Sequence, residues 1–169
     1  MAHVEPDARM REARAAHLKE RIYITFAALA VVLALRAHGH VEPWDALATL
    51  AVTVTGALFA VFTAEVLAHL VVHARMLDRH ELRQLCASTF GAFGVIVVPV
   101  IVLVLSGIGV VEVDTALVVS IVVLLLSLVL IGFLAVRRIR MAWWQRLVVL
   151  AAEAGLGLVV IGLQVLAHG

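Results

Sequence analysis

The sequence is poor in the residues that mark most soluble folds. Of its 169 residues only 15% are charged and 6% are aromatic, with three prolines and one cysteine. The single cysteine, Cys86, excludes an internal disulfide. A net charge of +1 lacks the basic field of a nucleic-acid-binding module. Hydrophobic residues instead make up 64% of the chain, against about 45–50% in soluble domains, and this predicts an integral membrane protein with the lipid bilayer as its partner.

Long apolar runs fill most of the chain, and they lack the alternation of barrel strands. A helix needs about 20 residues to cross a bilayer. Five runs near that length cover about residues 22–37, 44–72, 85–105, 114–136 and 142–167. The sequence therefore predicts an all-α membrane protein with five transmembrane helices in one domain, 22–169. Residues 1–21 are predicted to form a charged cytoplasmic helical arm that begins near Pro6.

Basic residues are distributed unequally between the two sides of this layout. Five lie in the N-terminal arm, three between the second and third runs and four after the fourth, while Arg36 alone lies opposite. Because basic loops stay in the cytoplasm, the N-terminus is predicted inside and the C-terminus outside. The expected location is the cell (inner) membrane.

Small residues and one proline carry packing information. Gly56, Ala60, Ala64 and Ala68 recur every four residues along the second run. Such a stripe allows helix backbones to approach closely, and we expect it to lie in a helix–helix contact of a homodimer. Pro99 is expected to kink the third helix and to leave carbonyl groups near Val95 free.

Two carboxylates, Glu65 and Glu153, lie within predicted spans. A charge at membrane depth costs about 2.5–3.5 kcal/mol even on the most permissive scale, so such residues are functional candidates. Counting helical rise from the cytoplasmic ends places both carboxylates at similar depth. We therefore expect Glu153 to be the partner of Glu65, since the predicted spans hold no intramembrane Lys or Arg.

Two histidines follow Glu65 at helical spacing. Glu65, His69 and His73 are four residues apart and share one helix face. Histidines at such spacing, with a carboxylate one turn away, can chelate a divalent ion. The predicted metal site therefore consists of Glu65, His69, His73 and Glu153, for iron, manganese or zinc. The alternative is that His73 is merely interfacial and His69 hydrogen-bonds a neighbouring helix.

The predicted outer side is acidic. Its candidate residues form a mouth that would attract cations: His38, His40, Glu42, Glu112 and Asp114. An acidic outer side would also result simply from the basic residues being on the cytoplasmic side. Whether the acidic residues attract cations or only reflect this distribution stays open.

The layout resembles the vacuolar iron transporter family. The resemblance rests on the segment Thr55-Gly56-Ala57-Leu58 before Glu65, and on the apolar run 116–136 followed by basic residues and a glycine-rich last helix. It implies a dimer of five-helix chains and transport of iron or manganese. The chain departs from the family pattern in its first run, where Tyr23 and Thr25 are the only polar side chains. The connecting segment 74–86 is also short and lacks the family's glutamate-rich region.

No catalytic template is present: the sequence has no Gly-x-Ser-x-Gly, P-loop or His-Glu-x-x-His. An enzyme is therefore not expected. The predicted function is a small membrane transporter or binding protein for a divalent metal cation, with proton antiport as a driving force. One alternative is a membrane scaffold or accessory subunit that does not transport. Another is a proton-conducting or pH-sensing membrane protein.

Overall fold

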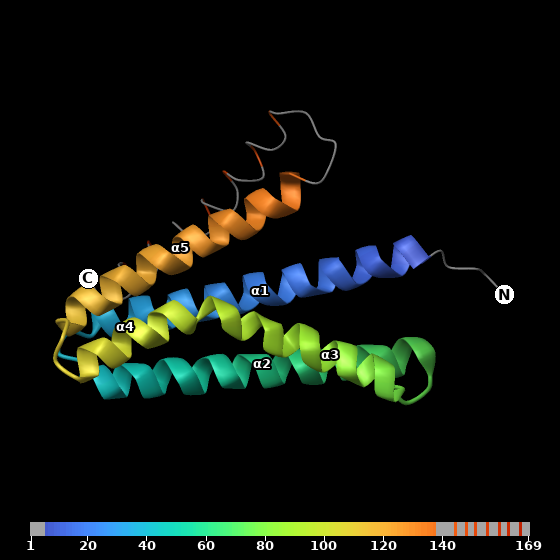
Figure 1. Cartoon of the computed structure of the whole chain (residues 1–169), viewed down its shortest axis with the longest axis horizontal. Coiled ribbons are helices and arrows are strands. Elements are labelled where there is room, and N and C mark those ends of the chain that lie inside the picture. The colour runs from blue at the N-terminus through green and yellow to red at the C-terminus, as the bar shows by residue number, and fades with distance from the viewer. Residues whose placement is uncertain are drawn as a thin grey trace.

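The computed structural model describes residues 6–137 and seven single helical positions between 144 and 166. Its elements in chain order are α1 (Pro6–Ala37), α2 (Pro43–His73), α3 (Arg79–Gly91), the 3-10 helix η1 (Ala92–Val95), α4 (Val97–Gly107) and α5 (Val113–Arg137) (Figure 1). The described part of the chain therefore contains helices and no strand. The prediction of an all-α protein is confirmed for these residues.

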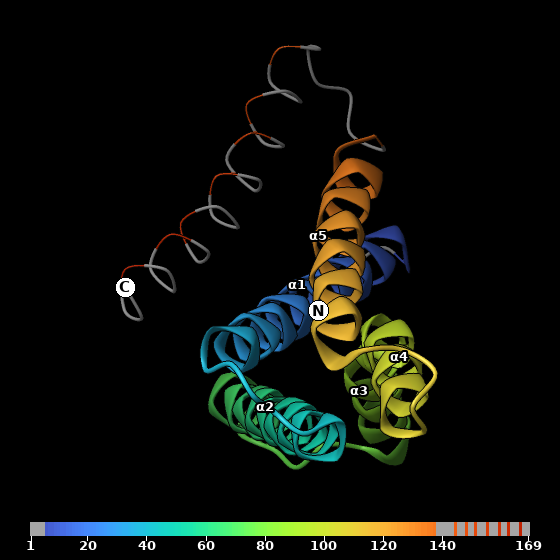
Figure 2. The same ribbon diagram turned by 90° about the vertical axis from the view of Figure 1, so that its left-hand side faces the viewer.

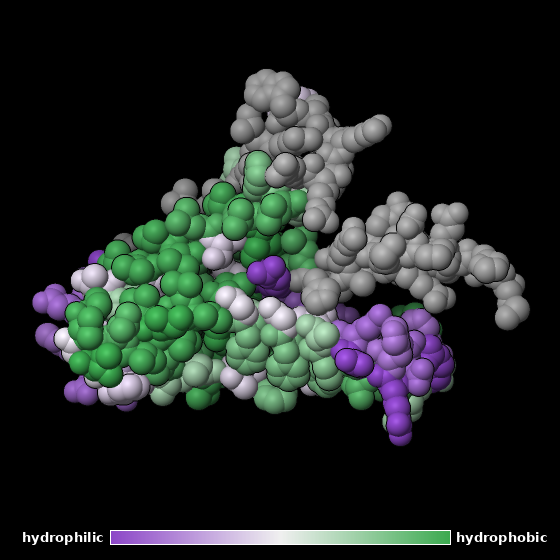
Figure 3. Space-filling view, viewed as in Figure 1, coloured by the Kyte–Doolittle hydropathy of each residue, from purple (hydrophilic) through white to green (hydrophobic). Residues whose placement is uncertain are grey.

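Two of the helices are long and apolar enough to cross a membrane. They are α2 and residues Val113–Ala135 of α5, and the bent pair formed by Arg79–Val95 and Val97–Gly107 would be a third. The face in Figure 3 shows an apolar body between polar ends. The fold is thus that of a membrane protein with two to three candidate spans among the described residues. The predicted fifth span falls mostly outside them, and the count of five with its orientation stays a prediction.

Helix α1 forms the centre of the bundle. It packs against α2, α3, η1 and α5, and Figure 2 shows it between α5 and α2. Ile24, Ala28 and Val32 are fully buried along one stripe of α1 at four-residue spacing, which places them on the same helical face. The helix begins at Pro6, as expected, and continues without a break from the charged arm into the first apolar run.

The third predicted span is broken. Helix α3 ends at Gly91, η1 follows, and the axis of α4 is bent by 48° from that of the preceding pair. Pro99 lies in the first turn of α4. Backbone N–H groups in this turn make no intrahelical hydrogen bond, so the missing N–H of proline costs the helix nothing there. A kink near Val95 was expected, and the structure confirms it.

The bundle has two unlike ends. At the His40 end, which holds the connections 38–42 and 108–112, the Trp44 ring of α2 lies against Gly107 of α4. A Cβ atom at position 107 would come within 2.7 Å of Trp44 Cε2. At the Glu65 end, α1, α2 and α3 meet and carry most of the charged side chains. The turn between α2 and α3 there is closed by Ala74, whose φ of 50° is left-handed.

The small-residue stripe does not pack inside the described protomer. Its four members, Gly56, Ala60, Ala64 and Ala68, are all exposed. A Cβ atom built at Gly56 would meet nothing within 4 Å. The stripe therefore makes no helix–helix contact within the described part of one chain, and its expected contact between two copies is not tested by a single protomer. The stripe is open to a second copy, and the homodimer stays a prediction.

Candidate functional site

The inward face of α2 leads directly to the predicted site. Leu50, Val54 and Leu58 are buried along this helix. Glu65 and His69 follow Leu58 by about two and three helical turns, so they continue the same face. Their side chains are 30% and 16% exposed, respectively. Both point toward neighbouring helices, as the cost of an unpaired charge in lipid requires.

Glu65 is paired with a lysine. Lys19 Nζ of α1 donates a hydrogen bond to Glu65 Oε1 at 3.2 Å. The prediction for Glu65 takes only Lys and Arg within the predicted spans as partners, so it does not foresee this pair with Lys19. Lys19 was assigned to the cytoplasmic arm, but α1 runs beside α2, and the long lysine side chain spans the remaining distance. Glu153, the predicted partner, lies outside the described residues.

His69 faces α3 rather than Glu65. Its Nε2 atom is 3.6 Å from Glu81 Oε2, just beyond hydrogen-bond distance. Its ring stacks on the ring of His73, with centroids 4.3 Å apart, and His73 is exposed. The alternative expectation was a hydrogen bond from His69 to a neighbouring helix; His69 does turn toward α3, but the 3.6 Å separation falls short of a hydrogen bond.

Glu81 is held as an anion by a second charged partner. Both Arg75 guanidinium NH2 groups bond the carboxylate, at 2.9 and 2.6 Å, and the Asp78 backbone N–H donates at 2.9 Å. The Arg75 bonds, followed by the Asp78 bond, lower the pKa of Glu81 from 4.5 to about 2. The same pairing raises the pKa of Arg75. Glu81 also completes a capping box with Asp78 at the start of α3, which fixes its backbone.

The predicted metal ligands do not converge. Within the described part of the chain, no group of three or more His, Cys, Asp or Glu side chains is arranged to hold a metal ion. Glu65 turns to Lys19 and His69 approaches Glu81, whereas His73 stacks on the His69 ring. The three residues share a face of α2, but each has a different neighbour.

A buried carboxylate was missed at the sequence level. Glu20 of α1 is only 1% exposed. The hydroxyls of Ser88 and Thr89, in the last turn of α3, donate to its Oε1 atom at 3.2 and 3.3 Å. Its position in a charged arm hid this role. The available signal was spacing, since Glu20 is one turn before the buried stripe of Ile24 and Ala28.

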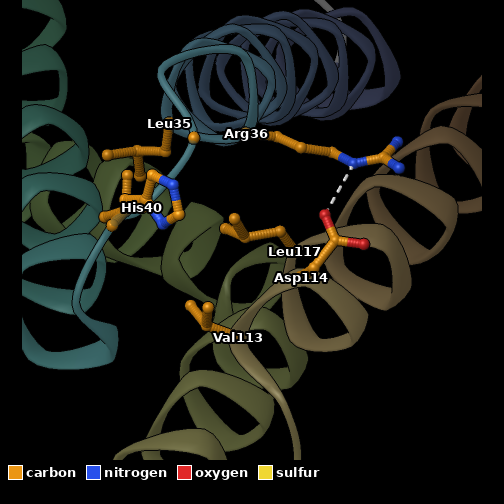
Figure 4. Close-up of a pocket in the computed structure, with 8 residues that line it drawn as sticks. Leu35, Arg36, His40, Val113, Asp114 and Leu117 are labelled. Atoms are coloured by element: carbon orange, nitrogen blue, oxygen red, sulfur yellow. Dashed lines mark hydrogen bonds and ion pairs between the residues drawn. The ribbon is translucent and has the colours of Figure 1, made fainter.

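The predicted outer mouth is a small hollow at the His40 end. Figure 4 shows His40, Leu117 and Val113 around it, with an ion pair between Arg36 Nε and Asp114 Oδ1 at 3.2 Å. Asp114 is therefore partly neutralised by Arg36. The other predicted members are not among the residues that line it. Glu42 precedes α2 and Glu112 precedes α5, while His38 Nδ1 lies 2.6 Å from the Ala34 carbonyl oxygen.

Comparisons of the chain with protein family models, with curated proteins and with solved structures find no match. The resemblance to the vacuolar iron transporter family therefore remains one of sequence pattern.

Proposed function

We propose that the chain is a small multi-pass membrane protein that senses protons through His69. The observation that supports this function best is the approach of His69 Nε2 to Glu81 Oε2 across two helices, at 3.6 Å. Histidine is the side chain that in general changes charge between pH 5 and 8. A change of charge at this position alters the attraction between α2 and α3.

The charges around His69 define how such a sensor works. Glu81 stays ionised across the physiological range, because its pKa is about 2, so the state of His69 decides the strength of the contact. Arg75 competes for the same carboxylate. The stacked His73 ring opposes a second positive charge beside the first, while Lys19 and Glu65 form their own pair one turn away. Protonated His69 draws α3 toward α2, and neutral His69 releases it.

Helix α3 is suited to transmit this movement because it leads into the break before α4. A shift of α3 relative to α2 changes the bend at η1 without unfolding either helix.

Cys86 of α3 provides the test, since it is the chain's only cysteine and is partly buried. The full-length protein in lipid nanodiscs is labelled with a thiol reagent from pH 8 to pH 5. The labelling rate of the wild type is divided by that of His69→Gln at each pH. This ratio corrects for the pH dependence of thiol reactivity, which both proteins share. The ratio should fall several-fold as the pH is lowered across this range. The exposed His80, replaced by Gln, is the control and should behave as wild type. A ratio that stays constant with pH would refute the proposal.

A second candidate function is binding or transport of a divalent cation of the iron or manganese type. The observation that favours it is His69, which stacks on the His73 ring and lies 3.6 Å from Glu81, because imidazole and carboxylate groups are ligands for such ions. Glu81 would have to leave Arg75 to take part. Elemental analysis of the purified protein and of His69→Ala tests this function. Metal that is bound by the wild type and lost in His69→Ala supports the cation-binding function. A protein that binds no metal and shows no pH-dependent labelling is better explained as a membrane scaffold or accessory subunit that does not transport.

We further propose that the chain forms a homodimer of five-span protomers through the small-residue stripe on α2. The exposure of Gly56 supports the dimer, and the distribution of basic residues supports the orientation. Reporter fusions should read cytoplasmic at the N-terminus and external after Gly169. Cytoplasmic readings at both ends would mean an even number of spans.

A further inference from the structure

The outward face of α3 changes from cationic to apolar along the helix. Arg79, Arg83 and Phe90 lie within about 40° of one another around the helix axis, because an α-helix turns by about 100° per residue. All three side chains are exposed, Phe90 by 50%. Two guanidinium groups therefore stand in line with an open aromatic ring on a face that packs against no described helix.

This change in character falls at one end of two candidate spans. Helix α2 ends at His73, and Arg79 begins the bent pair that would be another span. Figure 3 shows polar side chains gathered at this end of the apolar body. Phe90 lies about 10 Å further along α3 than Arg83, at 1.5 Å per residue. Apolar faces of interfacial helices reach about 5–10 Å into the boundary between headgroups and acyl chains, so Phe90 reaches acyl depth when the arginines lie among headgroups.

The two arginines of α3 have no carboxylate partner among the described side chains, unlike the basic residues beside them. Arg75 holds Glu81 through two hydrogen bonds, and Lys19 is paired with Glu65. The Asp78 carboxylate caps the backbone of α3. Residues four apart on a helix have Cβ atoms about 5–6 Å apart, and like charges at that spacing repel. A phosphate between the two guanidinium groups removes this repulsion, since each can donate two parallel hydrogen bonds to its oxygens.

From this arrangement we propose that the outward face of α3 binds an anionic phospholipid. Arg79 and Arg83 hold the headgroup, and Phe90 lies against the acyl chains. The Phe93 ring stacks on that of Phe90, with centroids 6.1 Å apart, and extends the apolar half. A Cβ atom built at Gly94 would meet nothing within 4 Å, so this side of the helix break is open to a hydrocarbon chain. A phospholipid fits because it carries negative charge and hydrocarbon in one molecule, at the separation that α3 presents.

The experiment is thermal unfolding of the full-length protein in detergent micelles, with phosphatidylglycerol or phosphatidylcholine added in equal amounts at constant pH and ionic strength. A ligand that binds the folded state raises Tm in a saturable way. We expect phosphatidylglycerol to do so, and phosphatidylcholine not to. Equal effects of the two lipids overturn the inference. If inorganic phosphate or a poly-glutamate peptide raises Tm as much as phosphatidylglycerol, the face binds anions without a lipid, and the inference is overturned as well.

Arginine variants assign the response to α3. Arg83→Gln should weaken the apparent affinity for phosphatidylglycerol about fivefold, and the double variant Arg79→Gln/Arg83→Gln about twenty-fivefold. The matched control is Arg21→Gln, which removes an exposed arginine from α1 and should change the affinity by less than about twofold. Equal losses in Arg21→Gln and Arg83→Gln would mean that the lipid responds to surface charge alone, and would overturn the inference. So would an undiminished affinity in the double variant.

The apolar half of the face has its own pair of variants. Phe90→Gln should weaken the affinity several-fold, whereas Phe90→Leu keeps an apolar side chain and should retain it. Equal affinities in these two variants overturn the inference. All variants should unfold at the wild-type Tm in phosphatidylcholine, which separates loss of binding from loss of folding. His69→Gln should keep the response to phosphatidylglycerol, so this test can fail or succeed independently of the proton sensor.

Discussion

Removing either partner of the Lys19–Glu65 ion pair should destabilise the protein, and by unequal amounts. Lys19 is 58% exposed and Glu65 30% exposed. After Glu65→Gln, the freed ammonium extends into water at little cost. After Lys19→Gln, the carboxylate is left largely covered and without this partner, and a covered charge that loses its partner carries a desolvation penalty.

The size of the effect follows from distance and exposure. At the 3.2 Å separation of Nζ and Oε1, Coulomb attraction is about 1.3 kcal/mol in bulk water and about 5 kcal/mol at an effective dielectric of 20. Exposed pairs retain only about 0.2–1 kcal/mol after solvation and side-chain entropy are counted. Since this pair is partly exposed, we expect a coupling energy of about 0.5–1 kcal/mol. Glu65→Gln should cost about 0.5 kcal/mol and Lys19→Gln about 1–2 kcal/mol.

A double-mutant cycle by reversible unfolding in mixed micelles measures this coupling. The control cycle uses Arg36→Gln and Asp114→Asn. That pair has the same 3.2 Å distance but is 47% and 71% exposed, so its coupling should be near zero. Equal coupling in both cycles, or a smaller cost for Lys19→Gln than for Glu65→Gln, would show that burial does not set the energy of the pair.

Four further outcomes are expected. Ala74→Gly should stabilise the protein by about 1 kcal/mol in thermal unfolding, because Ala74 has a left-handed φ of 50° that glycine adopts without strain; no change would argue against that conformation. Ionised Glu81, with its pKa lowered from 4.5 to about 2, should stabilise the fold fully above about pH 4.5. That contribution should disappear as pH falls toward 2, and a Glu81→Gln variant should lack this part of the pH profile. Gly107→Val should displace the Trp44 ring, changing tryptophan fluorescence and costing about 1–3 kcal/mol; an unchanged spectrum would contradict the contact. Gly56→Leu should yield monomers by light scattering, since no described side chain lies within 4 Å of a Cβ there and the fold of the protomer has room for the leucine; a dimer that persists would contradict the contact.

Helical membrane character could be predicted from the sequence because it depends on composition and run length alone. The hydrocarbon core demands long apolar segments with internal hydrogen bonds, and α2 and α5 satisfy that demand. The helix start at Pro6 and the break before Pro99 were also predictable. They follow from the backbone chemistry of proline, which acts locally.

The partners of the charged residues were decided by the tertiary structure. Spacing placed Glu65 and His69 on one face of α2, but it could not say that Lys19 and Glu81 lie opposite them. Such contacts depend on which helices are neighbours and on their relative shift, and periodicity within one helix carries no information on either. Glu20 shows the same limit. Its charge suggested a solvated arm, whereas the packing of α3 against α1 buries it against two hydroxyls, because burial belongs to the contact between helices and not to the residue.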